Sequence, residues 1–495
     1  MPSPVPVFAD PLPAPSPVSA QVSQRLLRQA TFGPTPAEMA AVQANGVDYW
    51  LTQQFQLPQS QMADGLDSNG VRAKLFLNMA TGADQLRQRV MFALSQTLVV
   101  SANKNVNGYE LIPWVRLLSN HAFGNYRTLL REVTLSPAMG KFLDLANSTG
   151  GMSTVAPNEN YPRELLQLFS IGIWKLKQDG TFMTTAGQPV PAYNQTTVTE
   201  VARALSGWTY PSVPGAQYRS HNPAHFEGLM EPRPANHDRG AKTILGTTIP
   251  ANQSVTDDLE TVLDIIFAHP NVPPFVATRL IRSLVTSNPT SAYITRVADK
   301  FVDNGQGVRG DLKAVVTAVL TDPDADLPEL TDGRLLDPVL HVIGLGRALG
   351  AQFGDPNQFM YVLGNLGQAP LNPASVFSFY SPLAPLPGDP TLFGPEFMVY
   401  PPALAVHRAN FTYGLLGGQF GSSFKVDLAP FVAAAANPPA LVELVNQRLL
   451  QGSMSPELFA LLVSSAQAIS DPAQRAFGAL YLAAISSEFM VHTGF

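Results

Sequence analysis

Residues 159–173 read ENYPRELLQLFSIGI, and residues 201–209 read VARALSGWT. A helix is predicted to begin near Pro162, because proline is accepted in the first turn of a helix. Successive residues of a helix are turned by about 100°, which gives this helix an apolar and a polar face. The predicted buried face holds Tyr161, Leu165, Leu168, Phe169 and Gly172. The opposite face is expected to hold Arg163, Gln167 and Ser170, with Glu164 at the border.

Helix-start signals recur along the chain, whereas strand signals are sparse. Residues 35–38 read TPAE, which places a hydroxyl at the N-cap, a proline after it and a carboxylate in the first turn. Residues 174–177 and 181–184 flank Asp179 and Gly180, a strong hairpin turn signal. The sequence therefore predicts a mainly α fold, a large multi-helix single domain with one or two small β-hairpins and long ordered loops.

Three stretches lack helix signals. Residues 1–20 are rich in proline and do not form an intact secretory signal, so the single helical domain is expected to cover residues 21–495. Residues 211–250 exceed an ordinary connection, which often marks a functional loop. The aromatic side chains of residues 372–402 either line a groove or pin a long loop to the core.

Composition excludes several classes of function. The 495 residues carry a net charge of −6 and no basic run, so nucleic acid is not expected as a partner. No uninterrupted apolar run reaches the roughly 18 residues of a transmembrane helix. Cysteine is absent, which excludes disulfides, thiolate catalysis and cysteine-ligated metal centres.

Several further strings accompany the opening stretch in a fixed order. They are RLLRQATFGPT (25–35), QRVMFALSQ (88–96), HDRGAK (237–242), DNGQGVRGDLK (303–313) and ALYLAAISSEF (479–489). Together they resemble a large bacterial family known as domain of unknown function 1800, over nearly the whole chain. The resemblance implies an exported protein, periplasmic or extracellular. It also implies a partner similar to the alkaline phosphatase and sulfatase superfamily.

The first candidate site lies at the start of the predicted helix. Glu164 at its border, beside Arg163 and after Glu159, is suited to act as a general acid or base or as a metal ligand. The alternative is a buried network of Glu and Arg that ties helices together, since partly buried charges are normally paired.

The second candidate site lies in the loop of residues 211–250. His221, His225 and His237 fall close together in a chain with only 8 histidines, and carboxylates lie among them. Imidazole and carboxylate suit zinc, manganese or iron, so a divalent metal held by His221, His237 and Asp238 is predicted. His237 and Asp238 rank first because they match the family string. The alternative is that His237 and Asp238 only anchor the loop by hydrogen bonds.

Substrate contacts are predicted at three nearby positions. Arg203 is suited to bind a carboxylate or sulfate, Trp208 to stack on a ligand, and Lys242 to bind an anion. Arg203 is alternatively paired with Glu200 on the same helix.

Two functions follow from these residues. The first is a metal- or carboxylate-dependent enzyme acting on an extracellular polymer or glycan, with Glu159, Arg163, Glu164, His237 and Asp238 around its site. The second is a non-catalytic accessory or assembly protein that binds a sulfatase-like partner or a surface polymer. Convergence of Glu164 and His237 in a solvent-reached cleft favours the enzyme, whereas burial and full pairing favour the accessory protein.

Overall fold

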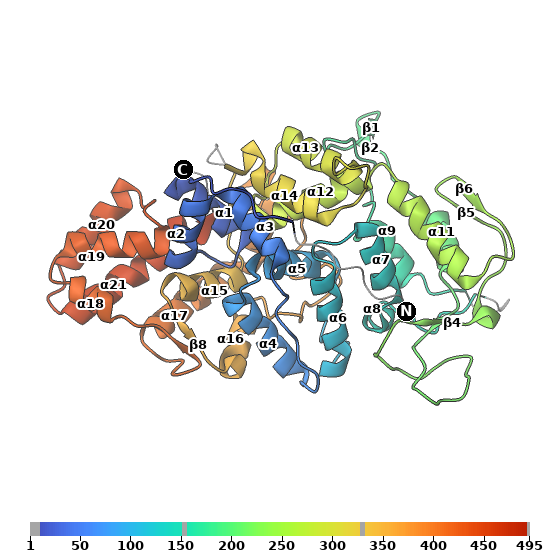
Figure 1. The fold of residues 1–495 in the computed structure, drawn as a ribbon, viewed down its shortest axis with the longest axis horizontal. Helices are drawn as coiled ribbons and strands as arrows, with labels where there is room; N and C mark the ends of the chain where they lie inside the picture. The colour runs from blue at the N-terminus through green and yellow to red at the C-terminus, as the bar shows by residue number, and fades with distance from the viewer. Residues whose placement is uncertain (1–9, 151–155, 327–331, 493–495) are drawn as a thin grey trace.

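The computed structural model describes residues 10–150, 156–326 and 332–492. It is 53% helical, with 22 α-helices and only two-stranded sheets among these residues. The predicted mainly α class with small hairpins is therefore confirmed. Figure 1 shows an elongated body, with the C-terminal helices at one end and the helices and hairpin from the middle of the chain at the other.

Eight helices form the N-terminal part of the body. They are α1 (Ala20–Ala30), α2 (Pro36–Asn45), α3 (Val47–Gln56), α4 (Ser68–Thr81), α5 (Gln85–Thr97), α6 (Gly108–Asn120), α7 (Tyr126–Leu135) and α8 (Pro137–Phe142). The predicted start of α2 is confirmed as a capping box. The Glu38 amide donates to Thr35 Oγ1 at 3.2 Å, and the Thr35 amide donates to Glu38 Oε2 at 3.0 Å.

The middle of the chain alternates helices with short hairpins. Its helices are α9 (Asn160–Gln167), α10 (Gln195–Ala204), α11 (Val255–Ala268), α12 (Val272–Leu284), α13 (Ser291–Val302) and α14 (Leu312–Thr321). Its strands are β1 (Thr184–Thr185), β2 (Gln188–Pro189), β3 (Trp208–Thr209), β4 (Glu231–Pro232), β5 (Lys242–Ile244) and β6 (Thr247–Ile249). The expected hairpin turn forms at Gly180, which has a φ of 77°, and Leu176 bridges Phe182 across it.

The C-terminal part returns to helices. They are α15 (Pro338–Ala348), α16 (Met360–Asn365), α17 (Pro402–Leu416), α18 (Ala429–Ala434), α19 (Pro438–Val445), α20 (Pro456–Gln467), α21 (Pro472–Ala484) and α22 (Ser487–Met490). Short strands accompany them, namely β7 (Arg334–Leu335), β8 (Gln352–Phe353), β9 (Pro385–Leu386), β10 (Asp389–Phe393), β11 (Phe424–Lys425) and β12 (Val491–His492). Strand β12 pairs with β7, which ties the C-terminal end of the described chain to the start of this part.

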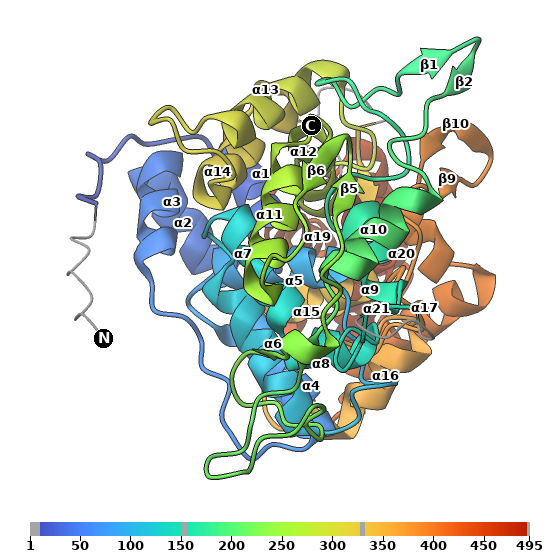
Figure 2. The same ribbon diagram turned by 90° about the vertical axis from the view of Figure 1, so that its right-hand side faces the viewer.

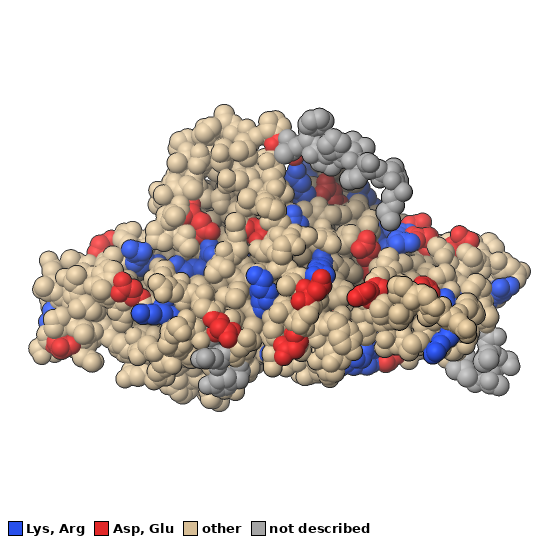
Figure 3. Space-filling view, turned by 60° about the horizontal axis from the view of Figure 1, so that its bottom comes forward, with Lys and Arg blue, Asp and Glu red and all other residues tan. Residues whose placement is uncertain are grey.

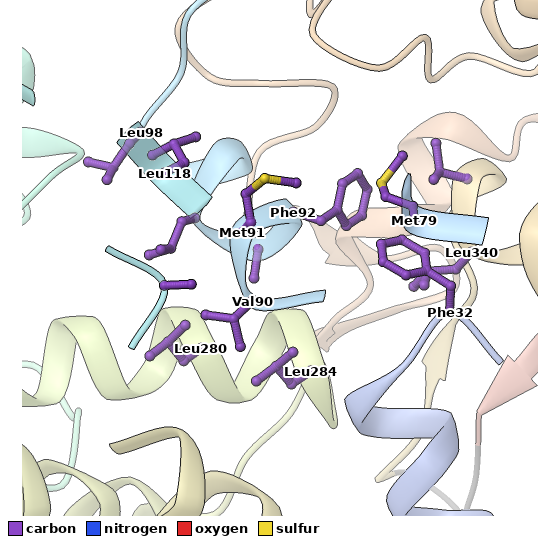
Figure 4. Close-up of a cluster of buried hydrophobic side chains, with 14 of the residues drawn as sticks. Phe32, Met79, Val90, Met91, Phe92, Leu98, Leu118, Leu280, Leu284 and Leu340 are labelled. Carbon is purple, nitrogen blue, oxygen red and sulfur yellow. The ribbon is translucent and has the colours of Figure 1, made fainter. Parts of the chain in front are cut away.

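One contiguous hydrophobic cluster runs from Leu26 to Met490. Helix α5 lies inside it and packs against α12, where Val90 faces Leu280 and Leu284 (Figure 4). None of the helices in residues 10–150, 156–326 and 332–492 has both the length and the apolar character that a bilayer crossing requires.

The α9 segment agrees with the predicted apolar face except at its end. Tyr161, Leu165 and Phe169 are fully buried. The expectation that Ser170 faces the polar side is wrong, because Ser170 is also fully buried and its hydroxyl donates to the Leu165 carbonyl. Helix α9 ends at Gln167, so the helical spacing no longer applies at residue 170.

Candidate functional site

Helix α10 lies at the centre of the predicted site, where it contacts α9, α11 and β5 (Figure 2). Its Asn194 N-cap accepts a hydrogen bond from the Thr197 amide at 3.0 Å. This cap fixes the start of α10, whose residues Gln195, Thr199, Glu200 and Arg203 then reach the neighbouring elements.

Glu159 is held by α10 and by its own helix. Its carboxylate accepts hydrogen bonds from Thr199 Oγ1 at 2.8 Å, Gln195 Nε2 at 2.7 Å and Arg163 Nη2 at 2.9 Å. The hydrogen bond from Thr199 lowers the pKa of Glu159, and Gln195 and Arg163 lower it further. Partial burial raises this pKa, but by less than the other groups lower it. Glu159 is therefore a charged and well-satisfied carboxylate.

Glu164, inside the helix that Glu159 caps, has the opposite environment. Burial raises the pKa of its carboxyl, an effect that the nearby Arg163 charge only partly offsets. Its Oε2 is buried and has no hydrogen-bond partner among the described residues. Burial, with the Glu164 charge, also raises the pKa of Tyr193 to about 12. The environment of Glu164 therefore favours the protonated acid, whereas that of Glu159 favours the carboxylate.

His237 and Lys242 lie elsewhere, around the fully buried Asp258 of α11. His237 Nε2 is 3.0 Å from Asp258 Oδ2, and Lys242 Nζ is 2.7 Å from the same oxygen. The other imidazole nitrogen, Nδ1, lies 2.9 Å from the Ser206 carbonyl. Lys242 Nζ also donates to the carbonyls of Asp238 at 2.5 Å and Gly240 at 2.9 Å. Lys242 Nζ therefore makes two hydrogen bonds and an ion-pair contact with Asp258. The contacts of His237 Nε2 and Lys242 Nζ with Asp258 Oδ2 lack hydrogen-bond geometry, and neither Asp258 oxygen has a hydrogen-bond partner among the described residues.

Arg203 and Asp238 extend this cluster toward the surface. Arg203 Nε and Nη2 donate to the two oxygens of Asp238 at 2.8 and 3.1 Å, and its Nη1 donates to Glu200 at 2.8 Å. Burial would raise the pKa of Asp238, but hydrogen bonds from Arg203 and the Gly240 amide outweigh it and lower the pKa. Arg203 is thus already occupied by two carboxylates.

The remaining predicted residues do not join one site. Trp208 in β3 is buried, which leaves its ring no exposed face for a ligand. His221 is exposed, and its Nε2 lies 3.3 Å from the side-chain Nδ2 of Asn236. Within the parts of the chain that the structure describes, no three His, Cys, Asp or Glu side chains are arranged to hold a metal ion. The structure therefore does not bring His221, His237 and Asp238 together as ligands.

Sequence reasoning missed the residues that complete these contacts. Asp258 is the most important, because it faces both His237 and Lys242. It shares the buried face of α11 with Val255, Leu259 and Val262. A charged residue on an otherwise apolar face was the available signal, since buried charges require partners.

A family model described as Protein of unknown function (DUF1800) matches residues 25–491, nearly the whole chain. This match agrees with the resemblance drawn from the ordered strings. Neither a curated protein nor a solved structure matches the chain.

Proposed function

The chain belongs to the DUF1800 family, and we propose that this member is a non-catalytic accessory protein, exported to the periplasm or the cell exterior, that binds a surface polymer or a sulfatase-like partner there. The observation that carries the proposal is the closed pairing of His237, Lys242, Asp238 and Arg203. Lys242, Asp238 and Arg203 each contact an opposite charge that the protein itself supplies, and His237 Nε2 lies 3.0 Å from Asp258 Oδ2.

A structural role accounts for this pairing. A buried charge that loses its partner costs several kcal/mol, about 3–5 for a fully buried pair, so such groups are retained in pairs. The pairs join α10, β5 and α11 with the residue 237–240 segment, which lacks regular structure of its own. The cluster therefore supports the reading in which the predicted loop site anchors the loop.

A second candidate function rests on Glu164. A half-buried carboxyl with a raised pKa and an unpartnered oxygen is a feature of acid catalysts, and Glu159 at the N-cap of the same helix stays ionised. This reading is a carboxylate-dependent enzyme that acts on an extracellular polymer or glycan, with Glu164 as acid and Glu159 as base. Its metal-dependent form would use His237 or His221 with Asp238.

One experiment separates the two candidates. Purified protein and its Glu164→Gln variant are incubated with a panel of extracellular glycans, and new reducing ends are measured. If the protein is an accessory protein, the parent should release no more reducing ends than Glu164→Gln does. Release by the parent that Glu164→Gln abolishes would contradict the accessory role. The metal-dependent form is tested by elemental analysis of protein never exposed to chelator. Stoichiometric metal in the parent that is lost in His237→Gln would also contradict the accessory role.

A further inference from the structure

A cavity of about 40 Å³ lies at the C-terminal half of α12, away from the residues predicted from the sequence. Its walls are formed by α5, α12, β7, residues 378–382 and the 3₁₀ helix η4 (Pro395–Val399). The lining side chains that matter for binding are Arg279, Arg282, Ser283, Arg334, Ser378 and Glu396. A void needs only about 10–15 Å³ to hold one water, so this cavity has room for a small polar group.

Arginine dominates the charge of this cavity. Arg334 is paired, with Nη2 2.9 Å from Glu396 and 3.8 Å from Asp337. Arg279 and Arg282, in contrast, have no carboxylate at ion-pair distance among the described residues. Arg282 donates to the Pro382 carbonyl at 3.2 Å and lies 4.1 Å over the Phe393 ring.

A fourth arginine adds to the excess of positive charge behind the cavity wall. Arg89 of α5 is 1% exposed and donates from Nη2 to the Ser283 carbonyl, which also accepts from Arg334. Its Nε and Nη1 are buried without a hydrogen-bond partner among the described residues. Burial lowers the pKa of Arg89 to about 9. Among the described residues, the carboxylates that act on Arg89 and Arg334 are Glu396 and Asp337, Glu396 also acts on Arg282, and no carboxylate acts on Arg279.

Two lining groups also have unused hydrogen-bonding capacity. Arg282 Nε and Ser378 Oγ are buried and have no partner in the described part of the chain. Ser378 is 7% exposed and has a φ of 66°, a left-handed conformation that serine rarely adopts. Buried donors without acceptors are uncommon in folded proteins, and a bound group that accepts from them is one explanation.

We propose that this cavity binds an oxyanion group, such as a carboxylate, sulfate or phosphate, between Arg279, Arg282 and Ser378. Guanidinium groups recognise these anions through two parallel N–H bonds, and a serine hydroxyl supplies a further donor. An anion would neutralise the excess of arginine and accept from the unused Arg282 and Ser378 donors. Binding of an anion in this cavity does not require the chain to be catalytic.

The clustering of arginine side chains at this cavity differs from the distribution of charge on the exposed surface. On the face shown in Figure 3, Lys and Arg are scattered among Asp and Glu over a mostly uncharged surface. A free anion and the acidic group of an organic ligand present the same chemistry to the cavity. Phe377 and Leu383 adjoin lining residues in sequence and are each 48% exposed, so they are exposed apolar side chains near the cavity along the chain.

Isothermal titration calorimetry tests the proposal with sulfate, phosphate, acetate and benzoate in a constant excess of chloride. The parent is expected to bind at least one of them at least tenfold more tightly than Arg279→Gln, Arg282→Gln or Ser378→Ala does. Arg219→Gln, which removes an exposed arginine, should bind like the parent. One outcome is that the parent binds benzoate more tightly than acetate and that Phe377→Ser weakens the binding of benzoate alone. The oxyanion then belongs to an organic ligand. If Phe377→Ser has no effect, the site takes a free ion.

Melting temperatures show whether a variant that loses binding is still folded. In chloride alone, Arg279→Gln should melt no lower than the parent, because it removes a buried cation that has no counter-charge. Addition of the bound anion should raise the melting temperature of the parent and of Arg219→Gln, but not of Arg279→Gln. The proposal is overturned if no probe binds in excess of chloride, or if the arginine variants bind and respond like the parent.

Discussion

Glu164 of α9 and Glu159 at its N-cap show how far environment separates the pKa values of two residues of one type. Glu159 accepts three side-chain hydrogen bonds, which hold its pKa low. Glu164 has its Oε2 buried without a partner, and burial holds its pKa high. The sequence predicted that both carboxylates lie together beside Arg163, but not that their titrations differ. That difference depends on Thr199 and Gln195 of α10, which are distant in sequence.

The raised pKa of Glu164 predicts a stability that depends on pH. An acid whose pKa is higher in the folded than in the unfolded state destabilises the fold as pH rises through and above its unfolded value, near 4.5. Glu164→Gln should therefore unfold at the same or a higher urea concentration than the parent at pH 7. Its advantage should shrink toward pH 4.

A matched variant tests the sign of this effect. Glu159→Gln should lower stability at pH 7, because Glu159 has a lowered pKa and stabilises the fold above it. A loss of several kcal/mol in Glu164→Gln at pH 7 would instead show that Glu164 is half of a buried pair with Arg163.

At the scale of elements, local signals predicted the helices well. The cap at Thr35 was read from four residues, and its reciprocal hydrogen bonds form as expected. Glu38 of that capping box also accepts from Arg347 of α15 at 2.7 Å, a contact that the sequence did not indicate. Cap chemistry is local and so is visible in sequence, whereas contacts between elements depend on the tertiary arrangement.

The capping box of α2 should have a measurable effect. Thr35→Ala removes the hydroxyl that accepts from the Glu38 amide, and the loss of such a cap costs about 1 kcal/mol of unfolding free energy. Thr35→Ser keeps the hydroxyl and should stay within a few tenths of the parent in urea unfolding. Equal losses in both variants would mean that the methyl group, rather than the cap, matters.

At the scale of the whole molecule, the fold class was predictable and the pairing of distant charges was not. Proline-led caps and helical spacing gave the mainly α architecture. Asp258 and its partners His237 and Lys242 come from different elements, and so do Arg334 and Glu396. Neither periodicity nor motif spacing reports which distant charges will meet in a core, so the arginine cavity was missed as well.

The single-domain prediction can be tested by calorimetry. Chains beyond about 250–300 residues usually divide into domains, yet one hydrophobic cluster here extends from Leu26 to Met490. We expect a single unfolding transition whose calorimetric and van't Hoff enthalpies agree. Two resolved transitions would show separate domains.

We interpret the predicted catalytic groups around Asp258 as structural pairs. A double-mutant cycle of Lys242→Met and Asp258→Asn, measured by urea unfolding, tests whether they are, with the exposed Asp264→Asn on the same helix as a control. Each single variant should lose about 3–5 kcal/mol. The double variant should lose less than their sum by roughly 1–3 kcal/mol, and the control should lose less than about 1 kcal/mol. Additive losses, or single variants as stable as the parent, would contradict the claim.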